Sequence, residues 1–183
     1  MPSLRNSSAF FFIAVSNLAA WNAVLVSITG FQRKFGPDIL LDMTWAFFAP
    51  SIPILLLSSN FDHRLDSTFG LFRCTSARML LSQGVITAIC VVMPFQPPDN
   101  LGYRLLIGSI VLLGVASGVA FGTTYRIVSK FPGYCTVALT VGFAASGPMI
   151  LVLQASLGMS DSKAAQIALY EFVAATGVIG MAG

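Results

Sequence analysis

Polar and aromatic side chains set within long apolar runs are the residues of this chain that could do chemistry. Asn17, Trp21 and Asn22 stand in the first run, where Asn17 and Trp21, four residues apart, share one face of a helix. Two amides and an indole are costly in hydrocarbon unless they meet partners or line a wet cavity. Two interpretations stay open: bonds between helices, with Trp21 as an interfacial anchor, or a wall that faces a solute.

Glu171 is a carboxylate about seven residues inside the last apolar run. A carboxylate at that depth normally faces the interior of a helix bundle and is a functional-site hypothesis by default. It could pair with an arginine, such as Arg78 at the start of the third run or Arg126, or it could carry a proton that is coupled to transport. The pairing role is the one that we predict.

Aromatic side chains in two further runs are suited to stacking on a flat ring. Phe121 and Tyr125 lie one helical turn apart, and Phe48 lies near Pro50, which should bend its helix. Each of these rings could equally pack against neighbouring helices or face lipid, so both interpretations stay open for them.

Residue types that support catalysis or metal binding are sparse and scattered. Cys74, Cys90 and Cys135 lie far apart with no CxxC spacing, and His63 is the only histidine of the sequence. The apolar runs contain no paired catalytic carboxylates and no Ser/His arrangement. We therefore predict no metal, no cofactor and no enzymatic activity.

The composition argues against a water-soluble globule. Of the 183 residues, 56% are apolar and 9% are charged, and the mean hydropathy is +0.82. Soluble domains carry about 25% charged residues, so this chain lacks the polar surface that a soluble fold needs. The net charge of +3 comes from scattered residues, which argues against nucleic-acid binding. We predict an integral protein of the lipid bilayer.

Six apolar stretches predict an all-α membrane protein, folded as one bundle of six transmembrane helices. Each stretch holds about 20 mainly apolar residues, the length that crosses the hydrocarbon. They are residues 9–31, 39–61, 78–95, 102–125, 136–157 and 164–183, with breaks at 36–37, 62–76, 94–100, 131–133 and 158–162. A cytoplasmic N-terminus puts six Lys and Arg residues in the inner segments and four in the outer ones, so the positive-inside rule favours that orientation.

Small residues form stripes on the fourth and fifth predicted helices. Such stripes let helices approach closely in lipid, where packing rather than water drives association. The stripes consist of Gly114, Gly118 and Gly122, and of Gly142, Ser146 and Gly147. We predict that these two helices are tightly packed neighbours.

Several of these features together resemble one family, the equilibrative nucleoside transporters. The Trp21-Asn22 pair is similar to that family's Pro-Trp-Asn motif, with Ala20 in place of the proline. The turn at Phe131-Pro132 and the glycine-bearing helix after it look like the family's Leu/Phe-Pro turn and Ser-Gly-Gln-Gly-Leu-Ala-Gly helix. Prolines in the second helix, an arginine opening the third and a glycine-rich fourth helix follow in the family's order.

The resemblance implies an 11-helix relative of the major facilitator fold that moves nucleosides or nucleobases by alternating access. It also implies that Trp21, with Leu25 one turn on, contributes to the substrate cavity. Phe121 stands where a fourth-helix glutamine often contacts the nucleoside, and Phe143 replaces a glutamine of the fifth-helix motif. The family's base preference is therefore not carried over. Six helices are about half of such a transporter, so we expect an N-terminal half whose partner is the C-terminal half.

Three hypotheses follow for the function. The first is facilitative transport of a nucleoside or nucleobase, with a substrate site made of Trp21, Asn22, Leu25, Phe48 and Phe121. The second is transport of another small solute, coupled to protons through Glu171. The third is a non-transporting helical membrane subunit that binds a partner through its glycine stripes.

Overall fold

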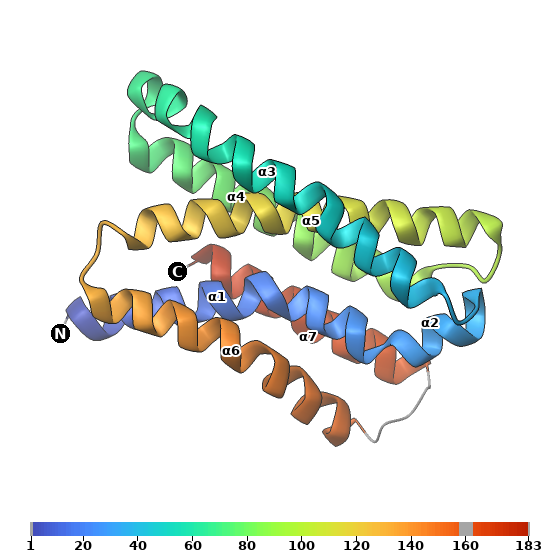
Figure 1. The fold of residues 1–183 in the computed structure, drawn as a ribbon. Helices are drawn as coiled ribbons and strands as arrows, with labels where there is room; N and C mark the ends of the chain where they lie inside the picture. The colour runs from blue at the N-terminus through green and yellow to red at the C-terminus, as the bar shows by residue number, and fades with distance from the viewer. Residues whose placement is uncertain (1, 158–162, 183) are drawn as a thin grey trace.

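The structure, a computed structural model, describes residues 2–157 and 163–182 (Figure 1). The side chains of residues 2–4, 58–69, 71 and 182, and the predicted break at 158–162, lie outside the described part. Its elements are α1 (Pro2–Val26), α2 (Ile28–Phe35), α3 (Ile39–Phe69), α4 (Leu71–Val92), the 3-10 helix η1 (Met93–Phe95), α5 (Asn100–Val128), α6 (Gly133–Ser156) and α7 (Lys163–Ala182). Within the described residues, six helices are long and apolar enough to cross a membrane. The predicted all-α fold with six spans is confirmed.

Two predicted boundaries are wrong. The first span, predicted over residues 9–31, is broken at Ser27 into α1 and the short α2. The loop predicted over residues 62–76 is helical except at Gly70, because α3 continues to Phe69 and α4 starts at Leu71. The chain turns at Gly70, whose φ of 86° is a conformation that glycine adopts readily.

The helices form two groups of three, as Figure 1 shows: α3, α4 and α5 in the upper half, and α1, α6 and α7 in the lower half. The most extensive helix pairings are α1 with α6 and α3 with α5. Helix α4 packs against α5 and α7, and α7 also packs against α1, so α4 and α7 join the two groups. Smaller contacts of α5 with α1 and with α6 also connect the two groups.

The glycine stripe of α5 lets this helix approach the backbone of α3. A Cβ atom on Gly114 would collide with the carbonyl oxygen of Phe47, and one on Gly118 would lie 3.1 Å from the carbonyl oxygen of Ser51. Gly122, the third member of the stripe, is half-buried. Two helices this close leave no room for side chains at the crossing.

The small residues of α6 face α1 rather than α5. A Cβ atom on Gly142 would lie 2.5 Å from the carbonyl oxygen of Phe11 and 2.8 Å from Cβ of Ala14. Gly147 lies in ordinary contact with the side-chain amide of Asn22. The prediction that α5 and α6 pack tightly against each other is therefore wrong, because each glycine stripe serves a different partner helix.

Candidate functional site

Trp21 lies in α1 and stacks on an aromatic ring of α3. Its ring centroid is 4.2 Å from that of Phe47, and the two ring planes are 16° apart. Phe48 meets Trp21 edge-on, with centroids 5.9 Å apart. Successive helix residues point about 100° apart, so Phe47 can be buried while Phe48 keeps 45% of its surface exposed. Trp21 is itself buried, with 7% of its surface exposed, so the open part of this cluster is the ring of Phe48.

Asn22 joins α1 to α6 beside this cluster. Its Nδ2 donates a hydrogen bond of 2.8 Å to Oγ of Ser146, and that hydroxyl donates one of 2.8 Å to the carbonyl oxygen of Phe143. Asn22 is half-buried, as is Leu25, which packs at the margin of the hydrophobic core. The amide therefore has a fixed position and is still partly accessible.

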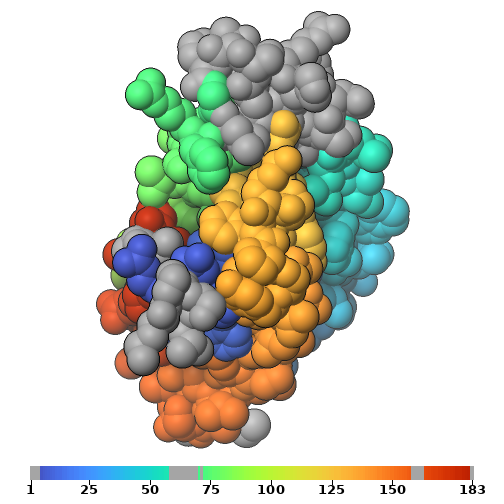
Figure 2. Space-filling model, turned by 90° about the vertical axis from the view of Figure 1, so that its left-hand side faces the viewer, coloured from blue at the N-terminus to red at the C-terminus, as the bar shows by residue number. Residues whose placement is uncertain are grey.

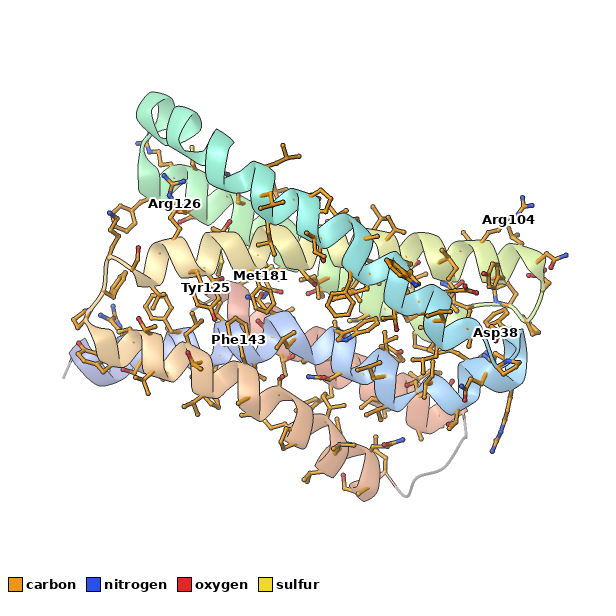
Figure 3. The ribbon with its side chains drawn as sticks, in the orientation of Figure 1. Asp38, Arg104, Tyr125, Arg126, Phe143 and Met181 are labelled. Carbon is orange, nitrogen blue, oxygen red and sulfur yellow. The ribbon has the colours of Figure 1, made fainter. Side chains whose placement is uncertain are left out.

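A second aromatic cluster bridges α5 and α6. The rings of Phe121 and Phe143 are stacked, with centroids 4.5 Å apart and planes 8° apart. Tyr125 extends the stack, 5.9 Å from Phe143, and Figure 3 shows these two side chains reaching toward each other from their helices. Tyr125 keeps 45% of its surface exposed. The cluster thus presents the exposed ring of Tyr125 beside the half-buried rings of Phe121 and Phe143.

The two clusters together form a surface that we call the aromatic face. It consists of Trp21, Asn22, Phe47, Phe48, Phe121, Tyr125, Phe143 and Ser146, from α1, α3, α5 and α6. Gly114 packs on Phe47, and Phe121 comes seven residues later, so the clusters lie about 10 Å apart along α5. None of these eight residues is a Lys, Arg, Asp or Glu. Trp21, Phe47 and Ser146 are buried, so the accessible groups of this face are the rings of Phe48 and Tyr125 and the half-buried side chains of Asn22, Phe121 and Phe143.

A buried polar network lies one turn before Trp21. Gln83 Nε2 donates to Oδ1 of Asn17 at 2.5 Å and to Oγ of Ser16 at 2.7 Å. Asn17 Nδ2 lies 3.4 Å from Oγ1 of Thr124. All four residues are buried, and they tie α1 to α4 and α5. For Asn17, the structure thus shows the interhelical bonds that the sequence left as one of two interpretations.

Glu171 does not lie near Arg78. Gly177 packs on Thr87 and Gly180 lies beside Gln83, which fixes the antiparallel register of α7 on α4. At 1.5 Å per residue, this register places Glu171 about 22 Å from Arg78 along the helix axes. Glu171 is exposed on the side of α7 that turns away from α1 and α4. The predicted pairing of Glu171 with Arg78 is therefore wrong.

Arg126 is no better placed as a partner for Glu171. It lies in the last turn of α5, at the same end of the bundle as Met181 (Figure 3). Met181 is ten residues beyond Glu171 on α7, which is about 15 Å along a helix. The prediction that this carboxylate faces the bundle interior fails because the apolar residues of α7 occupy that side.

Sequence reasoning missed several residues that the structure brings into the site. Phe47, the stacking partner of Trp21, could not be distinguished from Phe48 because both precede the same proline. Phe143 was singled out only as a replaced glutamine, and Ser146 only as a small residue. The feature of the sequence that could have identified such residues is a polar side chain inside an apolar run, and Gln83 has this feature too.

Removing the hydrogen bond between Asn22 and Ser146 is expected to weaken the α1–α6 contact only slightly. Interhelical hydrogen bonds in membranes average about 0.6 kcal/mol in double-mutant cycles. A cycle of Asn22→Leu and Ser146→Ala, measured by unfolding of the purified protein in detergent, should give a coupling of that size. Ser156→Ala is the control, since that hydroxyl bonds within its own helix. Strictly additive effects of Asn22→Leu and Ser146→Ala would contradict the bond.

No family profile matches the chain, and comparison with curated proteins finds a relative. The chain is similar to Equilibrative nucleotide transporter 8 of Arabidopsis thaliana, with 25% identity over 146 residues. The match covers 79% of this chain and 37% of that protein. The chain thus spans well under half of the length of this curated relative.

Proposed function

We propose that this chain, a divergent member of the equilibrative nucleoside transporter family, forms one helical bundle of a carrier for neutral nucleosides or nucleobases. The similarity to a transporter supports the family and a role in transport, and it fits a chain that is not an enzyme. The six apolar helices make it a multi-pass membrane protein. The observation that carries the proposal is the aromatic face, where stacked rings stand beside a fixed amide.

The cargo that we propose follows from the chemistry of this face. A nucleobase is flat, so it can stack on the exposed ring of Phe48 beside Trp21 or on the Phe121 cluster, and Asn22 can fix its orientation. A phosphate would instead call for cationic partners such as arginine. Because the face offers neutral groups, we favour a nucleoside or nucleobase over the nucleotide that appears in the relative's name.

The packing of the bundle supports a rigid-body transport cycle. Glycine contacts hold α3 on α5 and α1 on α6 at backbone distance, and α4 and α7 brace the two pairs from behind. Alternating access in many secondary transporters is rocking of one rigid bundle against another around a fixed site. We propose that the aromatic face is one wall of such a site and that a second helical bundle supplies the other.

Uptake of labelled nucleosides by the full-length protein, against cells that lack it, tests this function. We expect uptake of at least one nucleoside or nucleobase to rise above background, and AMP to compete poorly. Uptake equal to background for every purine and pyrimidine would contradict the proposal. Co-purification of a stoichiometric partner together with such a result would favour the non-transporting subunit.

Substituting Glu171 separates the proton-coupled alternative from facilitative transport. Glu171 lies on the outside of α7, and α7 packs on the side of the bundle away from the aromatic face. We therefore expect Glu171→Gln to change initial uptake rates less than about twofold, with no change in their pH dependence. Uptake that is driven by a pH gradient and abolished by Glu171→Gln would support proton coupling instead.

A further inference from the structure

A cavity separate from the aromatic face lies between α1, α4, α5 and α7. It has a volume of about 400 Å³, and none of the residues of the aromatic face lines it. It lies toward the end of the bundle where α1 begins and α7 ends (Figure 1). Figure 2 looks at this end, where segments of these four helices meet. Phe72 and Leu80 of its wall are 65% and 50% exposed, so the cavity opens to the surroundings of the bundle.

The depth of this cavity corresponds to one leaflet of a bilayer. Its wall on α4 runs from Phe72 to Gln83, eleven residues later, which is about 16 Å at 1.5 Å per residue. The hydrocarbon core of a bilayer is about 30 Å thick, so one leaflet accounts for about 15 Å. The apolar span of α4, Phe72–Phe95, begins at the mouth of the cavity, and that of α7, Lys163–Met181, ends there. The mouth therefore falls at the level of the lipid headgroups.

The deeper wall of the cavity is apolar. Gln83 and Thr124 line the inner end, but both are fully buried, so they present no accessible polar group to an occupant. No charged side chain is among the described residues that line the cavity. The largest apolar side chains of the wall below the mouth are Phe10, Ile13, Met79, Leu80, Ile127 and Phe131. An acyl chain suits this space, because it supplies dispersion contacts to side chains that would otherwise face a void.

Three exposed cations surround the mouth. Each is a direct neighbour in the sequence of a residue that lines the cavity, and they come from α1, α4 and the turn after α5: Arg5, Arg73 and Lys130. None of the three lines the cavity itself, so their charges lie at its rim. Asn6 and Ser76, which do line it near the mouth, add hydrogen-bond donors. The mouth thus offers positive charge and donors above an apolar interior.

The net positive charge of the chain is concentrated at this end. In the sequence, the N-terminus and the two connections on this side hold six Lys or Arg residues against two acidic residues, Asp62 and Asp66. The connections on the other side hold four basic and four acidic residues. The orientation that the positive-inside rule predicts puts the basic end in the cytoplasmic leaflet, where acidic phospholipids attract such residues.

We propose that an acidic phospholipid occupies this site, with one acyl chain in the cavity and its phosphate held by Arg5, Arg73 and Lys130. A zwitterionic lipid fits less well, because its ammonium group would meet the same three cations. Bound here, the lipid would contact four helices at once and so stabilise their arrangement. The proposal depends neither on the aromatic face nor on the solute that the protein carries.

Binding of two lipids with the same oleoyl chains tests this proposal. Dissociation constants of dioleoyl phosphatidylglycerol and dioleoyl phosphatidylcholine are measured by native mass spectrometry on the purified full-length protein in detergent. We expect the acidic lipid to bind at least about tenfold more tightly, because each Lys or Arg near the membrane surface contributes about fivefold. Equal affinities would overturn the proposal, as would the absence of bound lipid from a single copy or from a dimer that covers this face. Displacement of phosphatidylglycerol by glycerol 3-phosphate would assign the cations to a free phosphate ester instead and overturn the lipid assignment.

Arg73→Gln tests the role of the rim. Arg73 is exposed, so this change should leave the fold intact, lower the affinity for phosphatidylglycerol about fivefold and leave that for phosphatidylcholine unchanged. Arg104→Gln is the matched control, because Arg104 is an exposed arginine at the opposite end of the bundle (Figure 3). Equal losses in the two variants would mean that the overall charge of the protein, and not this rim, attracts the lipid.

Ala9→Leu tests the role of the cavity. Ala9 lines it, so a leucine there would fill the space and should remove the preference for phosphatidylglycerol over phosphatidylcholine. Ala88→Leu makes the same change on the exposed side of α4 and should leave both affinities unchanged. A preference that survives in an Ala9→Leu protein with unchanged thermal unfolding would place the lipid on the outer surface and overturn the assignment.

Discussion

Gly114→Ala is expected to destabilise the bundle by about 1–3 kcal/mol, the usual cost of overpacking a well-packed interior. The added methyl group would collide with the carbonyl oxygen of Phe47 and lie 3.1 Å from its Cα. Both atoms belong to the backbone, so α3 and α5 must move apart to make room. Because Phe47 also stacks on Trp21, the displacement should reach the aromatic face. Thermal unfolding of the purified protein in detergent measures the effect.

Gly108→Ala is the matched control for this substitution. Gly108 lies two turns earlier on α5, is exposed, and has no atom within 4 Å of the position of a new Cβ. Alanine is the better helix former by about 1 kcal/mol in water, so this change should be neutral or mildly stabilising. Equal losses of stability in the two variants would mean that the close α3–α5 contact at Gly114 does not decide the result.

The fold was predictable from the sequence because apolar length alone selects spanning helices. The length of an apolar run does not predict where its helix ends outside the hydrocarbon. The break at Ser27 and the extension of α3 to Phe69 both fall in such places. The partner helix of each glycine stripe was also unpredictable. A glycine such as Gly114 indicates that another helix approaches closely, but it does not indicate that the approaching residue is Phe47.

The candidate site was predictable in part, for a different reason. Trp21 and Asn22 stood out because polar and aromatic groups in hydrocarbon need partners, and both have them in the structure. The choice of Phe47 as the stacking partner depends on the rotation of α3, which its nearly uniform apolar sequence leaves undetermined. The predicted interior position of Glu171 was wrong because the expectation that intramembrane charges face the bundle interior does not determine which side of α7 packs on the neighbouring helices.

Trp21→Ala should reduce nucleoside uptake on the order of 10- to 100-fold if the aromatic face binds the base. Stacking of a base on an aromatic side chain is worth about 1–3 kcal/mol by alanine substitution, and about 1.4 kcal/mol is a factor of ten. Trp45→Ala is the matched control, because Trp45 is 66% exposed on α3 and belongs to neither aromatic cluster. Nucleoside uptake by the Trp45→Ala variant should equal uptake by the parent protein.

Folding must be separated from binding in this experiment, since replacing a packed tryptophan by alanine also costs about 3–5 kcal/mol of stability. Trp21→Phe keeps a ring on Phe47 and should retain most of the uptake, and Phe48→Ala removes an exposed ring at smaller cost to the core. Uptake per molecule at the cell surface is therefore compared among the three variants. If Phe48→Ala and Trp21→Phe behave like the parent while Trp21→Ala loses only surface protein, Trp21 supports the fold and the base binds elsewhere.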